Sequence, residues 1–160
     1  MTRQCLGLAF VLLLPCAGAQ AATVQEQFKA SVAELQNNPD SKELREKIIK
    51  LGLEIEPKPA VPEEADKHMA RGRAAANGAK DKAGFQEAAA EFKKAALAAP
   101  WLAQAYYNLG IVEDKAGDYA EAMKNLELYL SAAPGAKNAK KVKSLIFEIE
   151  YRLEKAAKEK

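Results

Sequence analysis

Cysteine and histidine are scarce in this 160-residue chain. The two cysteines, Cys5 and Cys16, lie within the first 21 residues, and His68 is the single histidine. Beyond residue 21 the chain therefore offers no disulfide, no cysteine metal site and no Cys/His nucleophilic pair. A Gly-rich phosphate loop and a His-Glu-x-x-His motif are absent as well. We predict that the protein is not an enzyme, has no cofactor or metal, and uses His68 as a surface or packing residue.

An excess of one charge and long apolar runs are also missing after residue 21. This part of the chain has 23 Lys and Arg residues against 22 Asp and Glu residues. Neither nucleic acid nor an anionic membrane surface is therefore indicated as a partner. No later stretch is a run of about 18 or more apolar residues, the length that would span a bilayer.

The first 21 residues have the three parts of a secretory signal peptide. Arg3 precedes an apolar stretch at residues 6–14, and a run of small residues follows Pro15. Cleavage after Ala19 or after Ala21 would satisfy the small-residue preference. Because Pro15, and not a small residue, precedes Cys16, lipid anchoring at Cys16 is the less favoured alternative. We therefore expect residues 1–21 to be a signal peptide and the protein to be exported, periplasmic or secreted.

Residues 22–56 are predicted to form an N-terminal helical hairpin. Apolar residues at helical spacing indicate a first helix over residues 24–37 and a second helix that begins after Asp40 or Ser41, either of which could cap it. This pair is either a degenerate repeat or a hairpin particular to this protein. The Pro-rich residues 57–62 then form an extended connector, which we take as the one internal boundary.

Helical spacing continues after the connector. It predicts one helix pair at residues 63–79 and 85–99, and a second pair between Pro100 and Pro134 with a tight turn at Gly117 and Asp118. We expect Gly117 to end a helix at positive φ and the Asp118 side chain to cap the next helix. Residues 137–160 carry a single apolar stripe and are predicted to form a C-terminal capping helix. The chain is therefore expected to be all-α.

The second pair resembles the tetratricopeptide repeat. Its Leu109-Gly110, Ala122 and Pro134 match the family pattern, and the period between Pro100 and Pro134 is 34 residues. Four residues depart from the pattern: Tyr106, Glu113, Leu126 and Tyr129. The resemblance implies a short tetratricopeptide-like α-solenoid of antiparallel helix pairs, with two repeats over residues 63–136. In the first repeat Gly72 is four residues out of register, so we expect an insertion within residues 77–84 that lengthens the turn.

The resemblance also implies a binding face. The first helix of each repeat would line a concave surface, which assigns to it Gln104, Tyr107, Asn108, Ile111 and Lys115. The alternative is that Tyr107 and Ile111 pack against the preceding repeat. Some members of the family trap a terminal carboxylate with polar residues at such positions. Counted 34 residues back, Arg73 and Asn77 align with two of them.

We therefore expect a non-catalytic adaptor that binds a peptide or protein segment in the cell envelope. The alternative is a self-associating structural subunit, in which the capping helix or the hairpin meets another copy.

Overall fold

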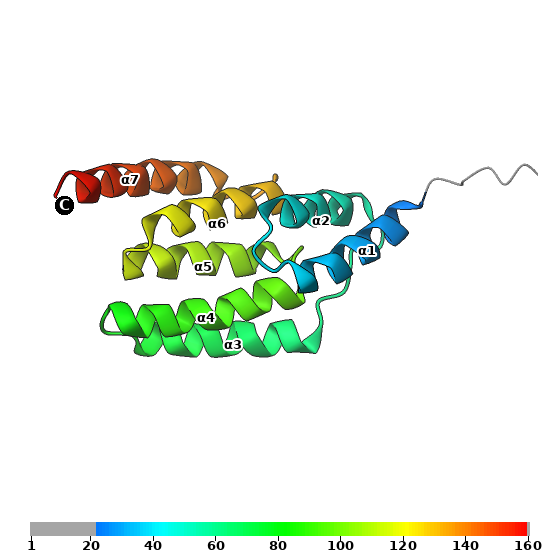
Figure 1. Ribbon diagram of the computed structural model, residues 1–160, viewed down its shortest axis with the longest axis horizontal. Coiled ribbons are helices and arrows are strands. Elements are labelled where there is room, and N and C mark those ends of the chain that lie inside the picture. The colour runs from blue at the N-terminus through cyan, green and yellow to red at the C-terminus, as the bar shows by residue number, and fades with distance from the viewer. Residues whose placement is uncertain (1–21, 160) are drawn as a thin grey trace, which may run out of the picture.

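The computed structural model describes residues 22–159, which are built from seven helices and contain no strand (Figure 1). This confirms the all-α prediction for that part of the chain. The proposed signal peptide, with its cleavage positions and Cys16, lies outside the described residues. The helices are α1 (Val24–Asn37), α2 (Lys42–Glu54), α3 (Glu63–Gly78), α4 (Lys82–Ala98), α5 (Ala103–Ala116), α6 (Tyr119–Ala132) and α7 (Ala139–Lys158).

Several helix ends follow from local side-chain chemistry. Thr23 and Glu26 form a capping box at the start of α1, and the Ser41 side chain accepts from the backbone N–H of Leu44 at the start of α2. Of the two predicted caps for α2, Ser41 is therefore the one used. Gly117 ends α5 at φ 78°, as predicted.

The predicted role of Asp118 is wrong. Its side chain makes no capping hydrogen bond at the start of α6. The Asp118 carboxylate instead accepts from Gln86 Nε2 at 3.4 Å and lies 3.6 Å from the Nζ of Lys82. Both partners belong to α4, so Asp118 links the turn after α5 to the neighbouring helix.

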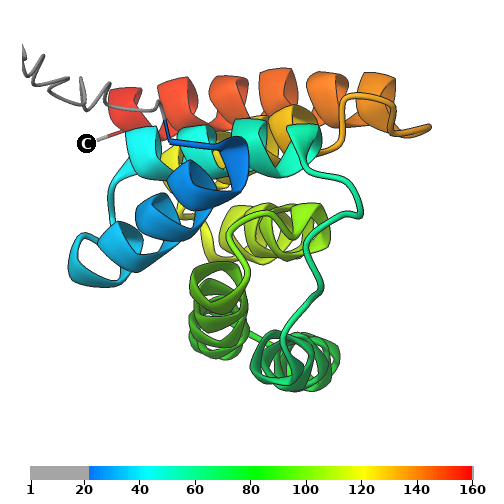
Figure 2. The same ribbon diagram turned by 90° about the vertical axis from the view of Figure 1, so that its right-hand side faces the viewer.

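The helices pack in chain order. From α3 to α7 each helix lies against the next in a stack. The α1–α2 hairpin lies beside the right-hand ends of these helices in Figure 1, where α2 contacts α6 (Figures 1 and 2). The connection over residues 55–62 contains no helix, as expected for the connector. None of the helices within residues 22–159 combines the length and the apolar character that crossing a membrane requires.

The apolar core has two parts. The larger one runs through α3 to α7 and includes Phe92, Tyr106 and Leu126. The smaller one lies inside the α1–α2 hairpin and is completed by two residues of the stack, Leu97 and Trp101. The Trp101 ring lies 5.0 Å from that of Phe28, and its Nε1 donates to the Pro59 carbonyl at 3.2 Å. Trp101 therefore joins the hairpin, the connector and the stack.

The helix pairs α3–α4 and α5–α6 each contain a close contact between a glycine of the first helix and a large side chain of the second. A Cβ added to Gly72 would lie 2.6 Å from the Phe92 ring, and a Cβ added to Gly110 would lie 2.7 Å from Cγ of Leu126. Small residues at these positions let the helices approach closely. The segment from Gly72 to Phe92 is four residues longer than the segment from Gly110 to Leu126.

The four extra residues lie where the sequence predicted an insertion, but they do not form a long turn. The α3–α4 connection has one residue more than the α5–α6 connection, and α4 begins three residues further before its Phe92 than α6 begins before Leu126. The four added residues correspond to about one helical turn, which has about 3.6 residues. Nearly the same face of α4 therefore still points toward α3.

Candidate binding surfaces

The five residues predicted on α5 do share one face of the helix. They recur every three or four residues, and Gln104 and Lys115 are exposed while Tyr107, Asn108 and Ile111 are half-buried. Gln104 Nε2 donates to Asn108 Oδ1 at 2.9 Å. We call these five residues the α5 surface.

Two members of the α5 surface also contact other helices. The Tyr107 ring lies 5.1 Å from the Tyr129 ring of α6 at an interplanar angle of 54°. Lys115 Nζ lies 5.2 Å from the centre of the Phe85 ring of α4. The ring of Tyr107 is therefore held by the helix that follows α5. This packing fixes the orientation of Tyr107 while leaving part of it accessible.

Arg73 and Asn77 are exposed on α3. They lie one and five residues after Gly72, just as Ile111 and Lys115 lie one and five residues after Gly110. Because both glycines face the partner helix of their own pair, Arg73 and Asn77 occupy the face of α3 that corresponds to the α5 surface. The register obtained by counting 34 residues, which paired Arg73 with Tyr107, is wrong by the four inserted residues.

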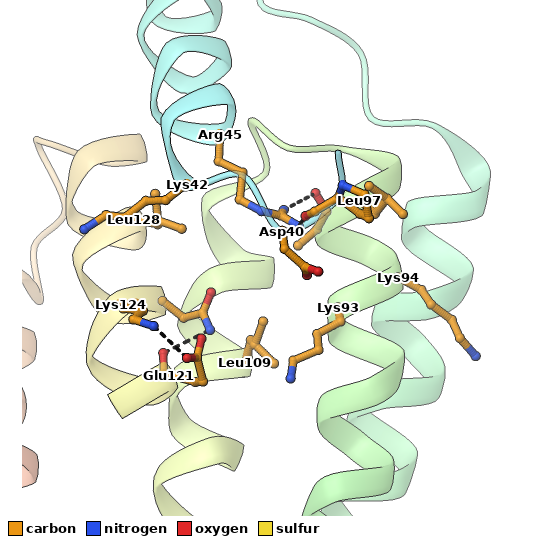
Figure 3. Close-up of a pocket in the computed structure, with 13 residues that line it drawn as sticks. Asp40, Lys42, Arg45, Lys93, Lys94, Leu97, Leu109, Glu121, Lys124 and Leu128 are labelled. Atoms are coloured by element: carbon orange, nitrogen blue, oxygen red, sulfur yellow. Dashed lines mark hydrogen bonds and ion pairs between the residues drawn. The ribbon is translucent and has the colours of Figure 1, made fainter. Parts of the chain in front are cut away.

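A cavity of about 620 Å³ lies elsewhere, between the α1–α2 hairpin and helices α4, α5 and α6 (Figure 3). None of the seven predicted residues lines it. Its lining combines basic, acidic and aliphatic side chains, and they are Pro39, Asp40, Lys42, Arg45, Lys93, Lys94, Ala96, Leu97, Leu109, Glu121, Lys124, Asn125 and Leu128. We call it the hairpin cavity.

Arg45 of α2 holds the hairpin against the end of α4 and so closes one end of the hairpin cavity. Its Nη2 donates to the Pro39 carbonyl at 2.6 Å, and its Nη1 donates to the Ala96 carbonyl at 3.3 Å and lies 3.5 Å from the Tyr106 hydroxyl. A cation here also interacts favourably with the C-terminal end of α4. Burial raises the pKa of the Tyr106 phenol, which donates to the Pro100 carbonyl at 2.8 Å.

A buried carboxylate lies beside the hairpin cavity. The Glu113 side chain is 1% exposed and accepts from Asn125 Nδ2 at 2.7 Å, while Lys93 Nζ lies 3.2 Å from its other oxygen. Burial raises the pKa of Glu113, and the hydrogen bond from Asn125 and the charge of Lys93 partly oppose this shift. Both partners of Glu113 line the cavity, so Glu113 helps to fix the position of Lys93.

We expect the replacement Glu113→Gln to change how stability depends on pH. A carboxyl group whose pKa is raised by folding favours the native state fully below its unfolded value of 4.5. This contribution is lost as pH rises through the higher folded value. The difference in unfolding free energy between Glu113→Gln and the natural protein should therefore shift in favour of the variant between pH 5 and pH 8. Urea unfolding at both pH values measures it, and a pH-independent difference contradicts the assignment.

The other charged groups near the hairpin cavity form pairs at its edges. Lys124 Nζ lies 2.7 Å from Glu121 of the same helix, and both side chains are 53% exposed. Lys94 Nζ lies 2.6 Å from Glu91, whose second carboxylate oxygen lies 2.8 Å from His68 Nδ1. The hydrogen bonds from Lys94 and His68 lower the pKa of Glu91 to about 2. His68 thus joins α3 to α4 through its contact with Glu91.

The hairpin cavity was not predicted from the sequence. The signal that could have indicated it is a Lys-x-x-x-Leu pair in each of two helices, Lys93 with Leu97 in α4 and Lys124 with Leu128 in α6. This spacing places both residues on one helix face. The α1–α2 hairpin that completes the cavity comes from a distant part of the sequence.

Within residues 22–159 there is no group of three or more His, Cys, Asp or Glu side chains arranged to hold a metal ion. Comparison with protein-family models, with curated proteins and with solved structures finds no match to this chain. The surfaces of this molecule are therefore the guide to its function.

Proposed function

We propose that the protein is a non-catalytic adaptor of the tetratricopeptide-like α-solenoid type, exported from the cell, that binds a protein segment on the α5 surface. The observation that carries this proposal is the repeated contact of Gly72 with Phe92 and of Gly110 with Leu126. It gives α3 and α5 equivalent positions within their pairs, so Arg73 and Asn77 lie on the face of α3 that corresponds to the α5 surface. In this proposal α7 covers the last repeat.

The chemistry of the α5 surface suits recognition of an extended chain. Tyr107 offers an aromatic face already held against Tyr129, so little side-chain freedom is lost when a ligand binds. The Asn108 side chain can donate to and accept from a peptide backbone. Its carboxamide is oriented by the hydrogen bond from Gln104.

Affinity capture from the envelope fraction of the exporting cell tests this proposal. We expect the natural protein to retain a protein partner that is lost with the double variant Tyr107→Ala, Asn108→Ala. The matched control is Tyr151→Ala with Asn38→Ala, which removes the same two residue types at exposed positions outside the α5 surface. Circular dichroism would verify that both variants are folded.

Retention of the same partners by the Tyr107→Ala, Asn108→Ala variant would show that the α5 surface is not the binding site. Loss of the partners from the Tyr151→Ala, Asn38→Ala control as well would mean that the effect is not local to α5.

A second candidate function is self-association as a structural subunit. The observation that favours it is a pair of aromatic side chains one helical turn apart on α7, Phe147 and Tyr151, each 68% exposed. Large exposed apolar side chains often mark a contact surface. Sedimentation equilibrium distinguishes the two functions, because a mass that rises with concentration and falls back in Phe147→Ser favours the subunit, and a strict monomer favours the adaptor.

A further inference from the structure

Helix α7 has one face against the stack and one face that is open to solvent. Val142 and Ile149 are buried, while Phe147 and Tyr151 are each 68% exposed. In Figures 1 and 2 α7 forms the upper edge of the molecule, and it packs against α6 on its inner side. Two large aromatic side chains next to each other on an exposed helix face are typical of a contact surface.

Four charged side chains complete this exposed face. Helical spacing places six exposed residues along one strip of α7, and they are Lys140, Lys143, Phe147, Glu150, Tyr151 and Glu154. We call this strip the outer face of α7. Both of its lysines precede Phe147 and both of its glutamates follow it. One half of the outer face is therefore positive and the other half is negative, with Lys158 beyond it near the end of the helix.

The four charges of the outer face are not neutralised within the described part of the chain. Ion pairs of α7 involve other side chains, such as Arg152, whose Nη2 lies 3.0 Å from the Asp114 carboxylate. The lysines and glutamates of the outer face are also too distant to pair with each other. Lys143 and Glu150, the nearest of opposite sign, are seven residues apart, which is about two helical turns. These charges are therefore available to a partner.

The charges are placed symmetrically about Phe147. Lys140 lies seven residues before Phe147 and Glu154 lies seven residues after it, about 10 Å along the helix in each direction. Lys143 lies four residues before Phe147 and Glu150 three residues after it, and both are turned to the same side of the strip. When two copies of α7 lie antiparallel with Phe147 opposite Phe147, each lysine meets a glutamate. A parallel arrangement places like charges together.

We propose that the outer face of α7 binds the same face of a second copy of this chain, in an antiparallel helix pair with two-fold symmetry. Phe147 contacts Phe147 of the second copy at the centre, with Tyr151 beside it. Lys140 pairs with Glu154 of the second copy, and Lys143 pairs with Glu150. This inference rests on self-association, the second candidate function, and specifies the surface and the orientation that produce it.

Sedimentation equilibrium of charge-reversed variants tests the inference. Lys140→Glu and Glu154→Lys each place like charges opposite one another, so each should weaken the dimer by about tenfold or more. An equal mixture of these two variants should associate about as strongly as the natural protein, because opposite charges meet again in the mixed dimer. The double variant Lys140→Glu, Glu154→Lys should also recover association. Residues 140 and 154 are about 21 Å apart along the helix, so recovery requires contact between two copies.

The matched control is Lys141→Glu. It makes the same change at the next residue, which is also exposed but is turned about 100° around the helix from Lys140. We expect it to change the association constant by less than about twofold, because surface charges away from the contact are screened by salt. Circular dichroism would verify that the variants keep their helices, as expected for changes at exposed positions.

Equal weakening by Lys140→Glu and Lys141→Glu, or no association in the mixture of variants, would overturn the antiparallel pairing while self-association itself stands. A natural protein that stays monomeric at about 1 mM would overturn both. Binding to vesicles of anionic lipid that is lost in Phe147→Ser would assign the outer face to a membrane and overturn the inference, although Glu150 and Glu154 oppose that outcome. The Tyr107→Ala, Asn108→Ala variant should associate as the natural protein does, so the α5 surface is tested independently.

Discussion

The replacement Gly110→Ala is expected to lower the free energy of unfolding by about 1 to 3 kcal/mol, the usual cost of overpacking. The new Cβ would lie 2.7 Å from Cγ and 2.9 Å from Cδ2 of Leu126, and 3.0 Å from the Ala122 carbonyl oxygen. Leu126 is fully buried and the carbonyl belongs to the backbone, so neither can move away freely. Alanine is the better helix former by about 1 kcal/mol, which offsets only part of this cost.

A double-mutant cycle with Leu126→Ala distinguishes this contact from a general effect on α5. Leu126→Ala alone should cost about 2 to 5 kcal/mol, because it leaves a cavity in the core. With that space available, Gly110→Ala should become neutral or stabilising. Chemical denaturation measures all four proteins. Gly78→Ala is the control, since a Cβ there meets no atom within 4 Å, and additive effects of Gly110→Ala and Leu126→Ala would contradict the prediction.

The replacement Arg45→Met should cost about 2 to 3 kcal/mol, as expected for losing charged hydrogen bonds to backbone carbonyls. Methionine keeps the apolar stem but leaves the carbonyls of Pro39 and Ala96 without their donor. Because Arg45 joins the hairpin to α4, we expect the hairpin to separate from the stack at lower denaturant concentration than α3 to α7 unfold.

Trp101 provides the measurement for Arg45→Met, since it is the single tryptophan of the chain. Its indole contacts Phe28 of the hairpin and donates to Pro59. Separation of the hairpin should shift Trp101 emission to longer wavelength before helical circular dichroism is lost. Lys47→Met, an exposed change on the same helix, is the control. Coincident fluorescence and circular dichroism transitions in Arg45→Met would contradict a local role.

The helices and their ends could be predicted from the sequence because they depend on neighbouring residues. The spacing of apolar residues gave the bounds of α1 as the structure has them, Ser41 was one of two predicted caps, and the positive φ of Gly117 follows from its place after the last turn of α5. The placement of Gln104, Asn108 and Lys115 on one face of α5 likewise follows from helical periodicity.

The features that could not be predicted from the sequence depend on contacts between distant residues. The Asp118 carboxylate could interact either with the N–H groups of α6 or with the side chains of Lys82 and Gln86 in α4. The sequence next to Asp118 indicates only the N–H groups of α6 as partners. The hairpin cavity could not be predicted because it needs α2 beside α4 and α6, and the Arg45–Ala96 contact joins residues 51 positions apart. Helical spacing predicts which residues share a face of α2, but it does not predict which helix packs against that face.

The contact of α2 with α6 has a consequence for the newly made chain. Lys42 and its partner Glu127 are 85 residues apart. At about 5 to 20 residues per second, a ribosome adds Glu127 about 4 to 17 s after Lys42. During this interval the apolar side chains of Phe28, Ile48 and Ile49 have only part of their final surroundings. The α1–α2 hairpin is therefore synthesised first but completes its packing only after α6 has been made, and until then its apolar face is open to unwanted association.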